Sequence, residues 1–461
     1  MTARTIISRC GAFPAPSFVS SFCMGWIEQK MRINHVKIAL AVLLSFQLLT
    51  AAHGQTISVE EKRIVDYVDA SSADAVALLE KTVNIESPTE NLVGVRDVGA
   101  VFMNEFRSIG LKSKWISMPE GMKSAGHLFA ETGGTSGKRI LLLGHLDTVL
   151  AGERFRREGQ KAFGTGTADM KAGNVVLYFA LKALHSAGVL KDARISILLT
   201  GDEEDAGVPI SISRADMIAA AKNNDLVLSF ENGGSNIATV ARRGYSDWEL
   251  EVTAKTGHSS AIFDQSMGSG AIFEASRILN DFYYELKDEK YLTFNPSIIA
   301  GGTEVSTDGR KLSVTGKGNV VPARVIVRGD LRFISEEQKT AGREKMTRIV
   351  SKSLPGASAK ITFRDEIPAM SPKPSNYELL KVLDRVSQDL GLGQIAPLDP
   401  GERGAGDISF IADLLPGLDG LGATGGKAHA KGEYADLDTL ARQTKRAAIL
   451  IYRLTRSHPQ Q

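Results

Sequence analysis

The stretch RILLLGHLD, residues 139–147, decides how the fold of this chain is interpreted. Residues 139–143 form a short apolar run, which is typical of a strand buried on both faces. His145 and Asp147 come at the end of that predicted strand, and residues two apart in extended chain share a face. Because ligands of open α/β sheets bind at the carboxyl ends of parallel strands, this polar pair marks a candidate functional site.

Two further predicted strands also end in acidic residues. The apolar run 194–199 leads into residues 202–205 (DEED), and the run 226–230 leads into Glu231. Adjacent acidic side chains are usually solvated. Four of them directly after an apolar strand would repel one another unless a cation offset their charge.

Two glycine-rich segments bring in the remaining candidate ligands. Residues 164–171 (GTGTADMK) place Asp169 just before a predicted helix, and residues 425–429 (GGKAH) place His429 near the C-terminus. A single histidine after a strand is more often an ordinary loop residue than a ligand. Two imidazoles together with several carboxylates are a more specific set, and they suit zinc, or cobalt or manganese.

The alternation of apolar strands with helices predicts an α/β fold with a mostly parallel sheet and helices on both faces. Later in the chain the strands become apolar on one face only, and helical spacing returns near residues 269–282. Residues 244–364 therefore predict an inserted α+β domain, close to βαββαβ with one extra strand. The interrupted α/β domain would comprise residues 55–243 and 365–461.

The sequence pattern also predicts individual helices and strands. Helical spacing from Val59 to Leu79 predicts one helix, and residues 171–185 predict another. Short strands are expected near residues 312–315 and 324–333 in the inserted domain.

Composition restricts the class of protein. The chain has 461 residues, of which 43% are hydrophobic and 23% charged, and its formal net charge is +2. This is an ordinary globular composition for two or more domains, and it excludes a disordered chain. Because the chain carries no basic block, we expect no nucleic-acid partner.

The N-terminus reads as a targeting segment. An apolar run over residues 38–49 follows a short basic stretch and precedes small residues, which predicts a secretory signal within residues 1–54. The alternative, a membrane anchor, requires about 20 apolar residues. Met31 is a second plausible start, which would make residues 1–30 an over-extended gene start; the alternative is that these residues form a long N-terminal region of the signal. We expect a periplasmic or secreted protein with no membrane association after signal cleavage.

Both cysteines of the chain, Cys10 and Cys23, lie in that segment. The mature chain therefore has no thiolate to act as a nucleophile or as a metal ligand. Any metal site must be built from histidine, aspartate and glutamate.

Three of these motifs together resemble the signature blocks of the co-catalytic zinc aminoacylase/carboxypeptidase family. They are residues 144–149 (GHLDTV), 164–171 (GTGTADMK) and 202–204 (DEE), and the likeness extends over essentially the whole mature chain. Residues 419–434, which include Glu433 and Tyr434, are most similar to the bacterial glutamate carboxypeptidase branch.

The resemblance implies two zinc ions per chain, with cobalt or manganese as substitutes. One ion would be held by His145, Asp169 and Glu231. The other would be held by Asp169, Glu204 and His429, so that Asp169 is shared.

The resemblance also implies the catalytic roles near the ions. Glu203 would act as the general base, and Asp147 would orient His145. The peptide bond after the shared ligand, Asp169–Met170, would be cis. Residues 404–407 (GAGD) depart from the more common Gly-Gly-x-Ser-Asp, and we expect no catalytic part for that loop.

In the inserted domain the resemblance implies dimerisation and substrate binding. His258, in the loop 257–260 (GHSS), would reach the active site of the partner subunit and donate to the oxyanion. Asn319 and Arg332 would bind the carboxylate of the substrate, a role that suits the planar fork of arginine. A homodimer is therefore expected.

These implications predict a dizinc hydrolase that cleaves an amide bond next to a free carboxylate. The expected substrate is a small peptide or an N-acyl amino acid, and the favoured activity is a carboxypeptidase that releases a glutamate-like residue. The alternatives are a deacylase or desuccinylase, or a dipeptidase, with the same metal centre. A non-enzymatic, metal-poor binding protein of the same fold is a further alternative, but such a protein should have lost a ligand or the base.

Overall fold

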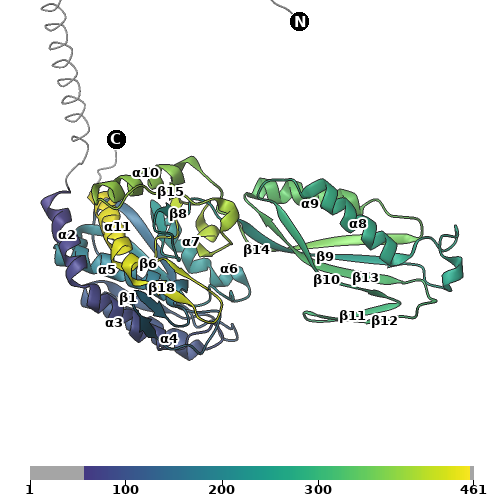
Figure 1. Ribbon diagram of the computed structural model, residues 1–461, viewed down its shortest axis with the longest axis horizontal. Helices are drawn as coiled ribbons and strands as arrows, with labels where there is room; N and C mark the ends of the chain where they lie inside the picture. The colour runs from purple at the N-terminus through teal and green to yellow at the C-terminus, as the bar shows by residue number, and fades with distance from the viewer. Residues whose placement is uncertain (1–56, 457–461) are drawn as a thin grey trace, which may run out of the picture. The chain divides into compact units, whose positions relative to one another are not determined.

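The computed structural model describes residues 57–456 of the 461 in the chain (Figure 1). The predicted signal segment, with Cys10, Cys23 and Met31, lies outside the described residues. Within residues 57–456, no helix has the length and apolar character that a membrane span requires.

A six-stranded sheet forms the centre of the α/β unit. Its strands are β1 (Lys112–Ile116), β2 (His127–Glu131), β3 (Ser136–His145), β6 (Ala193–Thr200), β7 (Leu226–Ser229) and β16 (Gly417–Leu418). Their order is β1-β2-β6-β3-β7-β16. The last four in this order are parallel, whereas β1 and β2 pair in antiparallel fashion at one edge. The mostly parallel sheet predicted from the sequence is confirmed.

Helices cover both faces of this sheet. They are α2 (Val59–Ala70), α3 (Ser72–Val83), α4 (Leu92–Ser108), α5 (Ala172–Ser186), α6 (Ile210–Ser213), α7 (Ala215–Lys222), α10 (Pro374–Asp389) and α11 (Leu437–Arg456). Ile140 and Leu142 of β3 belong to an apolar core with α5 and α11, whereas Leu141 and Leu143 belong to another with α7. Because both faces are covered, successive residues of β3 are all apolar.

The helix predicted from Val59 to Leu79 is two helices, α2 and α3, which meet at Ser71. The hydroxyl of Ser71 donates to the carbonyl oxygen of Tyr67 at 2.8 Å. A serine that bonds back to the preceding turn competes with the helical backbone pattern and favours a break. Apolar spacing alone did not reveal this break.

A second sheet and its helices form the inserted α+β unit. The elements are β9 (Gly244–Ala254), α8 (Gly270–Leu286), β10 (Thr293–Gly302), β11 (Glu304–Asp308), β12 (Lys311–Thr315), β13 (Arg324–Phe333), α9 (Glu336–Val350) and β14 (Ala357–Ile367). The antiparallel sheet has the order β10-β13-β9-β14 and a core of its own. The extra strand predicted near residues 312–315 is β12, which pairs with β11 as a separate hairpin.

A small third sheet joins two distant parts of the α/β unit. Its strands are β4 (Arg156–Glu158), β5 (Lys161–Phe163), β17 (Gly425–Gly426) and β18 (Tyr434–Asp436), in the order β17-β18-β5-β4. A further short pair consists of β8 (Ile237–Ala238) and β15 (Ala396–Pro397). The pairing of β18 with β5 brings the glycine-rich segment 164–171 beside the segment 425–433.

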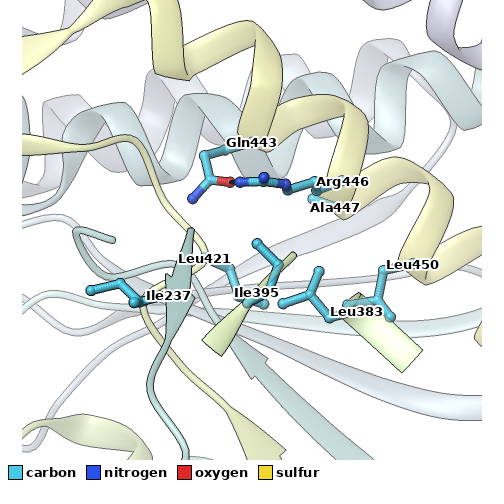
Figure 2. A pocket seen from close by; sticks show the side chains of 9 residues that line it. Ile237, Leu383, Ile395, Leu421, Gln443, Arg446, Ala447 and Leu450 are labelled. Carbon is cyan, nitrogen blue, oxygen red and sulfur yellow. Dashed lines mark hydrogen bonds between the residues drawn. The ribbon is translucent and has the colours of Figure 1, made fainter. Parts of the chain in front are cut away.

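The α/β unit also contains a small cavity beside α11, which Figure 2 shows from close by. Its volume is about 10 Å³, which is room for one water molecule at most. Gln443 and Arg446 line one side and are joined by a hydrogen bond of 3.0 Å from Nη1 of Arg446 (Figure 2). Arg446 also donates to the carbonyl oxygen of Leu392 at 3.0 Å. The bond to Leu392 ties α11 to a loop, and the cavity is too small for a substrate.

Candidate metal centre and active site

The carboxyl ends of three parallel strands meet at one edge of the central sheet. His145 is the last residue of β3 and is paired in register with Thr200, the last residue of β6. Glu231 follows the end of β7 by two residues. The acidic run that begins at Asp202 follows β6 in the same way. The convergence predicted from the sequence is therefore present.

His145 is almost completely buried and faces two carboxylates through Nε2. Oδ1 of Asp169 lies 3.1 Å from this nitrogen, and Oε1 of Glu231 lies 3.5 Å from it. On the other side of the ring, Nδ1 lies 3.0 Å from the backbone carbonyl oxygen of Asp147 and 3.4 Å from Oδ1 of its side chain. A hydrogen on Nδ1 is thereby fixed, and Nε2 is directed to the cluster.

His429 reaches the same cluster from the C-terminal segment. Its Nε2 lies 3.0 Å from Oδ2 of Asp169 and 3.2 Å from Oε2 of Glu204. Asp169 therefore presents one carboxylate oxygen to His145 and the other to His429. The peptide bond between Asp169 and Met170 is cis, as the resemblance implies.

Burial and the short distances between these groups shift the pKa values of the cluster. Burial alone would raise the pKa of Asp169, but the two imidazoles lower that pKa overall. Contacts with Asp169 and Glu204 raise the pKa of His429 to about 10. Burial, together with the charge of Asp169, raises the pKa of Glu231 to about 8. Burial also raises the pKa of Glu203, and Glu231 contributes to that shift.

The cluster fits a divalent cation. Donor atoms of His145, Glu203 and Glu231 all lie within 4.8 Å of one another, and the same holds for His145, Asp169 and Glu204. Oε1 of Glu204 is buried and has no hydrogen-bond partner among residues 57–456. A buried, unpaired carboxylate oxygen among several acids is what a cation would compensate. The first donor set contains Glu203, which the resemblance assigns as the base.

Asp147 holds the loop that carries Glu203 and Glu204. Its carboxylate accepts the backbone N–H of each of these residues at 3.1 Å and the hydroxyl of Thr89 at 2.7 Å. The nearest contact of Asp147 with the His145 ring is through its backbone carbonyl oxygen. The side chain of Asp147 therefore anchors the acidic loop in addition to lying beside His145.

A buried arginine supports the same loop from the other side. Nη1 of Arg214 donates to Oδ1 of Asp202 at 2.7 Å, and its Nη2 donates to the carbonyl oxygen of that residue at 2.9 Å. Nε of Arg214 lies 2.8 Å from Oδ1 of Asp407. Asp407 also accepts the hydroxyl of Thr200 at 2.6 Å. The loop 404–407 thus contributes Asp407 to a buried network, which no local sequence pattern predicts.

Among residues 57–456, no hydrogen bond, ion pair or ring contact joins the cluster to the three site residues predicted in the inserted unit, His258, Asn319 and Arg332. His258 is exposed, and its Nδ1 lies 2.8 Å from the hydroxyl of Ser260. The carbonyl oxygen of Asn319 accepts the N–H of Ser259 at 2.9 Å, so His258 and Asn319 belong to adjoining loops. No hydrogen bond or ion pair between residues 57–456 joins either of them to the candidate metal ligands.

Arg332 lies on an open face of the inserted sheet. Its Nε donates to Oδ2 of Asp330 at 3.0 Å, and its guanidinium lies 4.5 Å from the centre of the Tyr245 ring. It borders a cleft of about 1080 Å³ that three other arginines also line, Arg310, Arg328 and Arg364. Arg328 is paired with Glu249, and Arg364 is paired with Asp247.

The fold and the clustered ligands together define a metal-dependent hydrolase of amide bonds. Residues 141–453 match peptidase family M20/M25/M40, and the chain belongs to this family. The prediction of an enzyme is confirmed by this membership, and the metal-poor binding protein is not supported.

Two curated relatives align over most of the chain. Carboxypeptidase G2 of a Pseudomonas species is 29% identical over 389 residues, which are 82% of this chain and 88% of that protein. Succinyl-diaminopimelate desuccinylase of Gluconacetobacter diazotrophicus is 24% identical over 362 residues, which are 76% of this chain and 89% of that protein.

Solved structures show the same fold at lower identity. Aminopeptidase PepT from Bacillus cereus has a TM-score of 0.65 at 17% identity and covers 83% of this chain and 98% of its own. Human carnosine dipeptidase 1 has a TM-score of 0.61 at 16% identity, covering 87% of this chain and 100% of its own. A Bacillus subtilis protein described as a dinuclear metal-binding peptidase has a TM-score of 0.59 at 12% identity. Its alignment covers 84% of this chain and 99% of its own.

Proposed function

We propose that this enzyme is a dizinc carboxypeptidase that releases a glutamate-like residue from a small peptide or an N-acyl amino acid. The observation that carries the proposal is the position of Asp169. Its two carboxylate oxygens face two different imidazoles, and each imidazole also faces a second carboxylate, Glu231 or Glu204. A carboxylate shared in this way can hold two cations side by side and offset their repulsion.

The residues divide into two ligand sets. His145, Asp169 and Glu231 would hold one ion, and Asp169, Glu204 and His429 would hold the other. Imidazole and carboxylate ligands without thiolates suit zinc, with cobalt or manganese as substitutes. When bound, such ions polarise a substrate carbonyl and lower the pKa of a bound water towards neutrality.

Glu203 carries out the proton transfer in this proposal. Its carboxylate accepts a proton from the attacking water and passes it to the nitrogen of the departing amine. Burial and neighbouring acids raise the pKa of Glu203, and bound cations would oppose that shift. Asp147 holds the backbone of Glu203 in place through its carboxylate.

The preference for a carboxypeptidase rests on the relative with the higher identity. The desuccinylase relative aligns over a similar share of its own length, and the same metal centre serves that reaction. A deacylase or desuccinylase is therefore the alternative activity, and a dipeptidase is a further one. In all three cases Arg332 and Asn319 would bind the carboxylate of the substrate, with Arg332 oriented by Asp330 and Tyr245.

The assembly and the location of the enzyme belong to the same proposal. The inserted unit exposes large apolar side chains, which would pack against a second copy in a homodimer. They are Phe263, Ile272, Phe273, Tyr283, Tyr284, Ile298, Ile299 and Val314. His258, which is exposed, would then serve the active site of the partner. Residues 1–54 would direct export to the periplasm or the medium.

A substrate panel with metal analysis tests the function. The purified enzyme, loaded with zinc, is offered N-acyl and peptidyl glutamates, and free glutamate is measured. Parallel assays measure acetate and succinate released from acyl derivatives of other amino acids. Glutamate release supports the carboxypeptidase, succinate or acetate release supports the alternative, and no release from either group contradicts both.

A further inference from the structure

We infer that Glu433 is a positioning residue that fixes the backbone of Asp169, so that one C-terminal loop serves both sides of the metal centre. The inference rests on the proposed function in one respect, namely that Asp169 is the shared ligand. The sequence placed Glu433 four residues after His429 but gave it no role.

Three backbone N–H groups converge on the carboxylate of Glu433. Oε1 accepts from Ala168 at 2.8 Å and from Asp169 at 2.9 Å, and Oε2 accepts from Gly166 at 2.8 Å. The side chain is only 4% exposed. Charge-assisted bonds to a buried carboxylate are stronger than neutral ones. The turn 166–169 is therefore held at three points by one side chain.

Local backbone geometry makes the start of that turn specific for glycine. Gly166 has a φ of +76°, and a Cβ atom at this position would lie 2.4 Å from Cγ2 of Thr148. The turn is thus adapted to glycine and to close packing, and it ends at Asp169. A loss of the anchor would shift the Asp169 carboxylate relative to both His145 and His429.

Glu433 is itself fixed by strand pairing. It directly precedes β18, which pairs with β5, and its own carbonyl oxygen accepts the N–H of Gly164 at 3.1 Å. Both its backbone and its side chain therefore hold the segment 161–169. His429 lies in the loop that leads into Glu433, so the same loop provides one ligand and anchors the shared one.

The arrangement requires a carboxylate. Both oxygens of Glu433 accept hydrogen bonds, whereas a glutamine offers one oxygen and an NH2 group that donates. In Glu433→Gln, at least one backbone N–H would face another donor, while size and shape stay the same. A buried donor without an acceptor is costly, so the turn would move.

The chain provides a matched control. Oε2 of Glu153 accepts the N–H of Gly432 at 2.7 Å, so it anchors the His429 loop but bonds to none of residues 166–169. Glu153→Gln is the same chemical change at a carboxylate whose single side-chain hydrogen bond among residues 57–456 a glutamine oxygen can keep. It tests whether loss of one negative charge near the loop is enough to give the same result.

The test measures metal affinity in the full enzyme. Zinc binding is followed by competition with a chelating dye, and the visible spectrum of the Co²⁺-loaded protein reports the ligand geometry. Substitutions of residues that hold metal ligands typically reduce metal affinity by about ten- to a hundred-fold. We expect Glu433→Gln to lower the affinity for both ions by this factor, because both ions would share Asp169. We also expect the Co²⁺ spectrum to change. Glu433→Asp, which keeps both acceptor oxygens, should recover part of the affinity.

In Glu153→Gln, the affinity for the ion on the His145 side should stay within about two-fold of the wild-type value, because the Glu153 side chain contacts the loop that carries His429. If Glu433→Gln has the metal affinities and the Co²⁺ spectrum of the wild type, the inference about Glu433 is wrong. The proposed two-ion function is not affected by that result. A Glu433→Gln protein that binds the ions more weakly but keeps the wild-type Co²⁺ spectrum also overturns it, because the ligand geometry is then unchanged and the role is general stability. A wild-type chain that binds no ion contradicts the proposed function itself.

Discussion

Nε2 of His429 lies 3.0 Å from Oδ2 of Asp169, although 260 residues separate them in the chain. The contact exists because β18 pairs with β5 and brings the two loops together. It places His429 beside Asp169, a candidate metal ligand from a distant part of the chain. Half of its side chain remains exposed, so an ion at this side of Asp169 is the more accessible one.

His429→Ala should therefore lower the zinc content from two ions per chain to about one. The remaining imidazole, His145, serves the other ligand set, and Asp169 stays available to it. Metal analysis of the purified variant after zinc loading provides the measurement. His185→Ala, which removes an exposed histidine at the end of α5, is the control and should retain both ions. Two ions in His429→Ala would exclude His429 as a ligand.

Glu203→Gln should abolish turnover without removing metal. The substitution keeps the shape of the side chain but cannot accept a proton, and general acid–base catalysis contributes about 10²–10⁴-fold. We expect a fall in kcat of at least this size, measured with the zinc content of the same sample. Glu204→Gln should lose metal as well as activity. The reverse pattern would mean that the two glutamates exchange roles, which is a real alternative because Glu203 lies in one of the compact donor sets.

Arg214→Met should strongly destabilise the fold. Arg214 is 1% exposed and is paired with both Asp202 and Asp407, so its loss leaves buried carboxylates without a partner. Breaking a buried pair by removing one partner costs about 3–5 kcal/mol. The free energy of unfolding in denaturant measures this cost. Arg139→Met, which breaks the exposed pair with Asp225, should cost less than about 1 kcal/mol. Equal costs would contradict the buried network.

The pH dependence of stability should reflect Glu61, which links α2 to α11. Burial alone would raise the pKa of Glu61, but the bonds from Arg453 and Ser58 lower that pKa overall. A lowered folded pKa stabilises the protein above the unfolded value of about 4.3, and this contribution is lost as the pH falls through the folded pKa. The difference in unfolding free energy between wild type and Glu61→Gln should therefore shrink from about pH 6 to about pH 3. Glu60→Gln, at an exposed position, is the control, and a constant difference for Glu61→Gln would contradict the linkage.

Much of the metal centre could be predicted because its residues follow strong local patterns. His145 and Glu231 come directly after continuous apolar runs, and parallel strands place such positions at one edge. Glu433 and Arg214 have no such pattern. Each resembles a surface charge in the sequence and becomes buried only through contacts with distant segments. The strands β5 and β18, which create the first of these contacts, have three residues each, too few for a periodic signal.

In the inserted unit as well, local sequence patterns predicted some elements, whereas elements without a clear apolar pattern were missed. Alternation along β9 correctly indicated one buried face, with Trp248, Leu250 and Val252 inside. The strand near residues 312–315 was expected, but its partner β11 was not, because Val305 is the one buried apolar residue of β11. Ser71, which ends α2, was also missed, since its effect depends on a hydrogen bond rather than on hydrophobic spacing.

His258 has an exposed ring that is bonded only within its own loop among residues 57–456. If it serves the partner subunit, a His258→Ala chain and a Glu203→Gln chain should each be inactive alone. Loss of an oxyanion donor costs about 10²–10³-fold in kcat, so the background is low. A mixed dimer combines Glu203 of the first chain with His258 of the second in one of its two sites, so exchange should restore activity to half of the sites in hybrids. Confirmed exchange without restored activity would mean that His258 acts within its own chain or has no catalytic role.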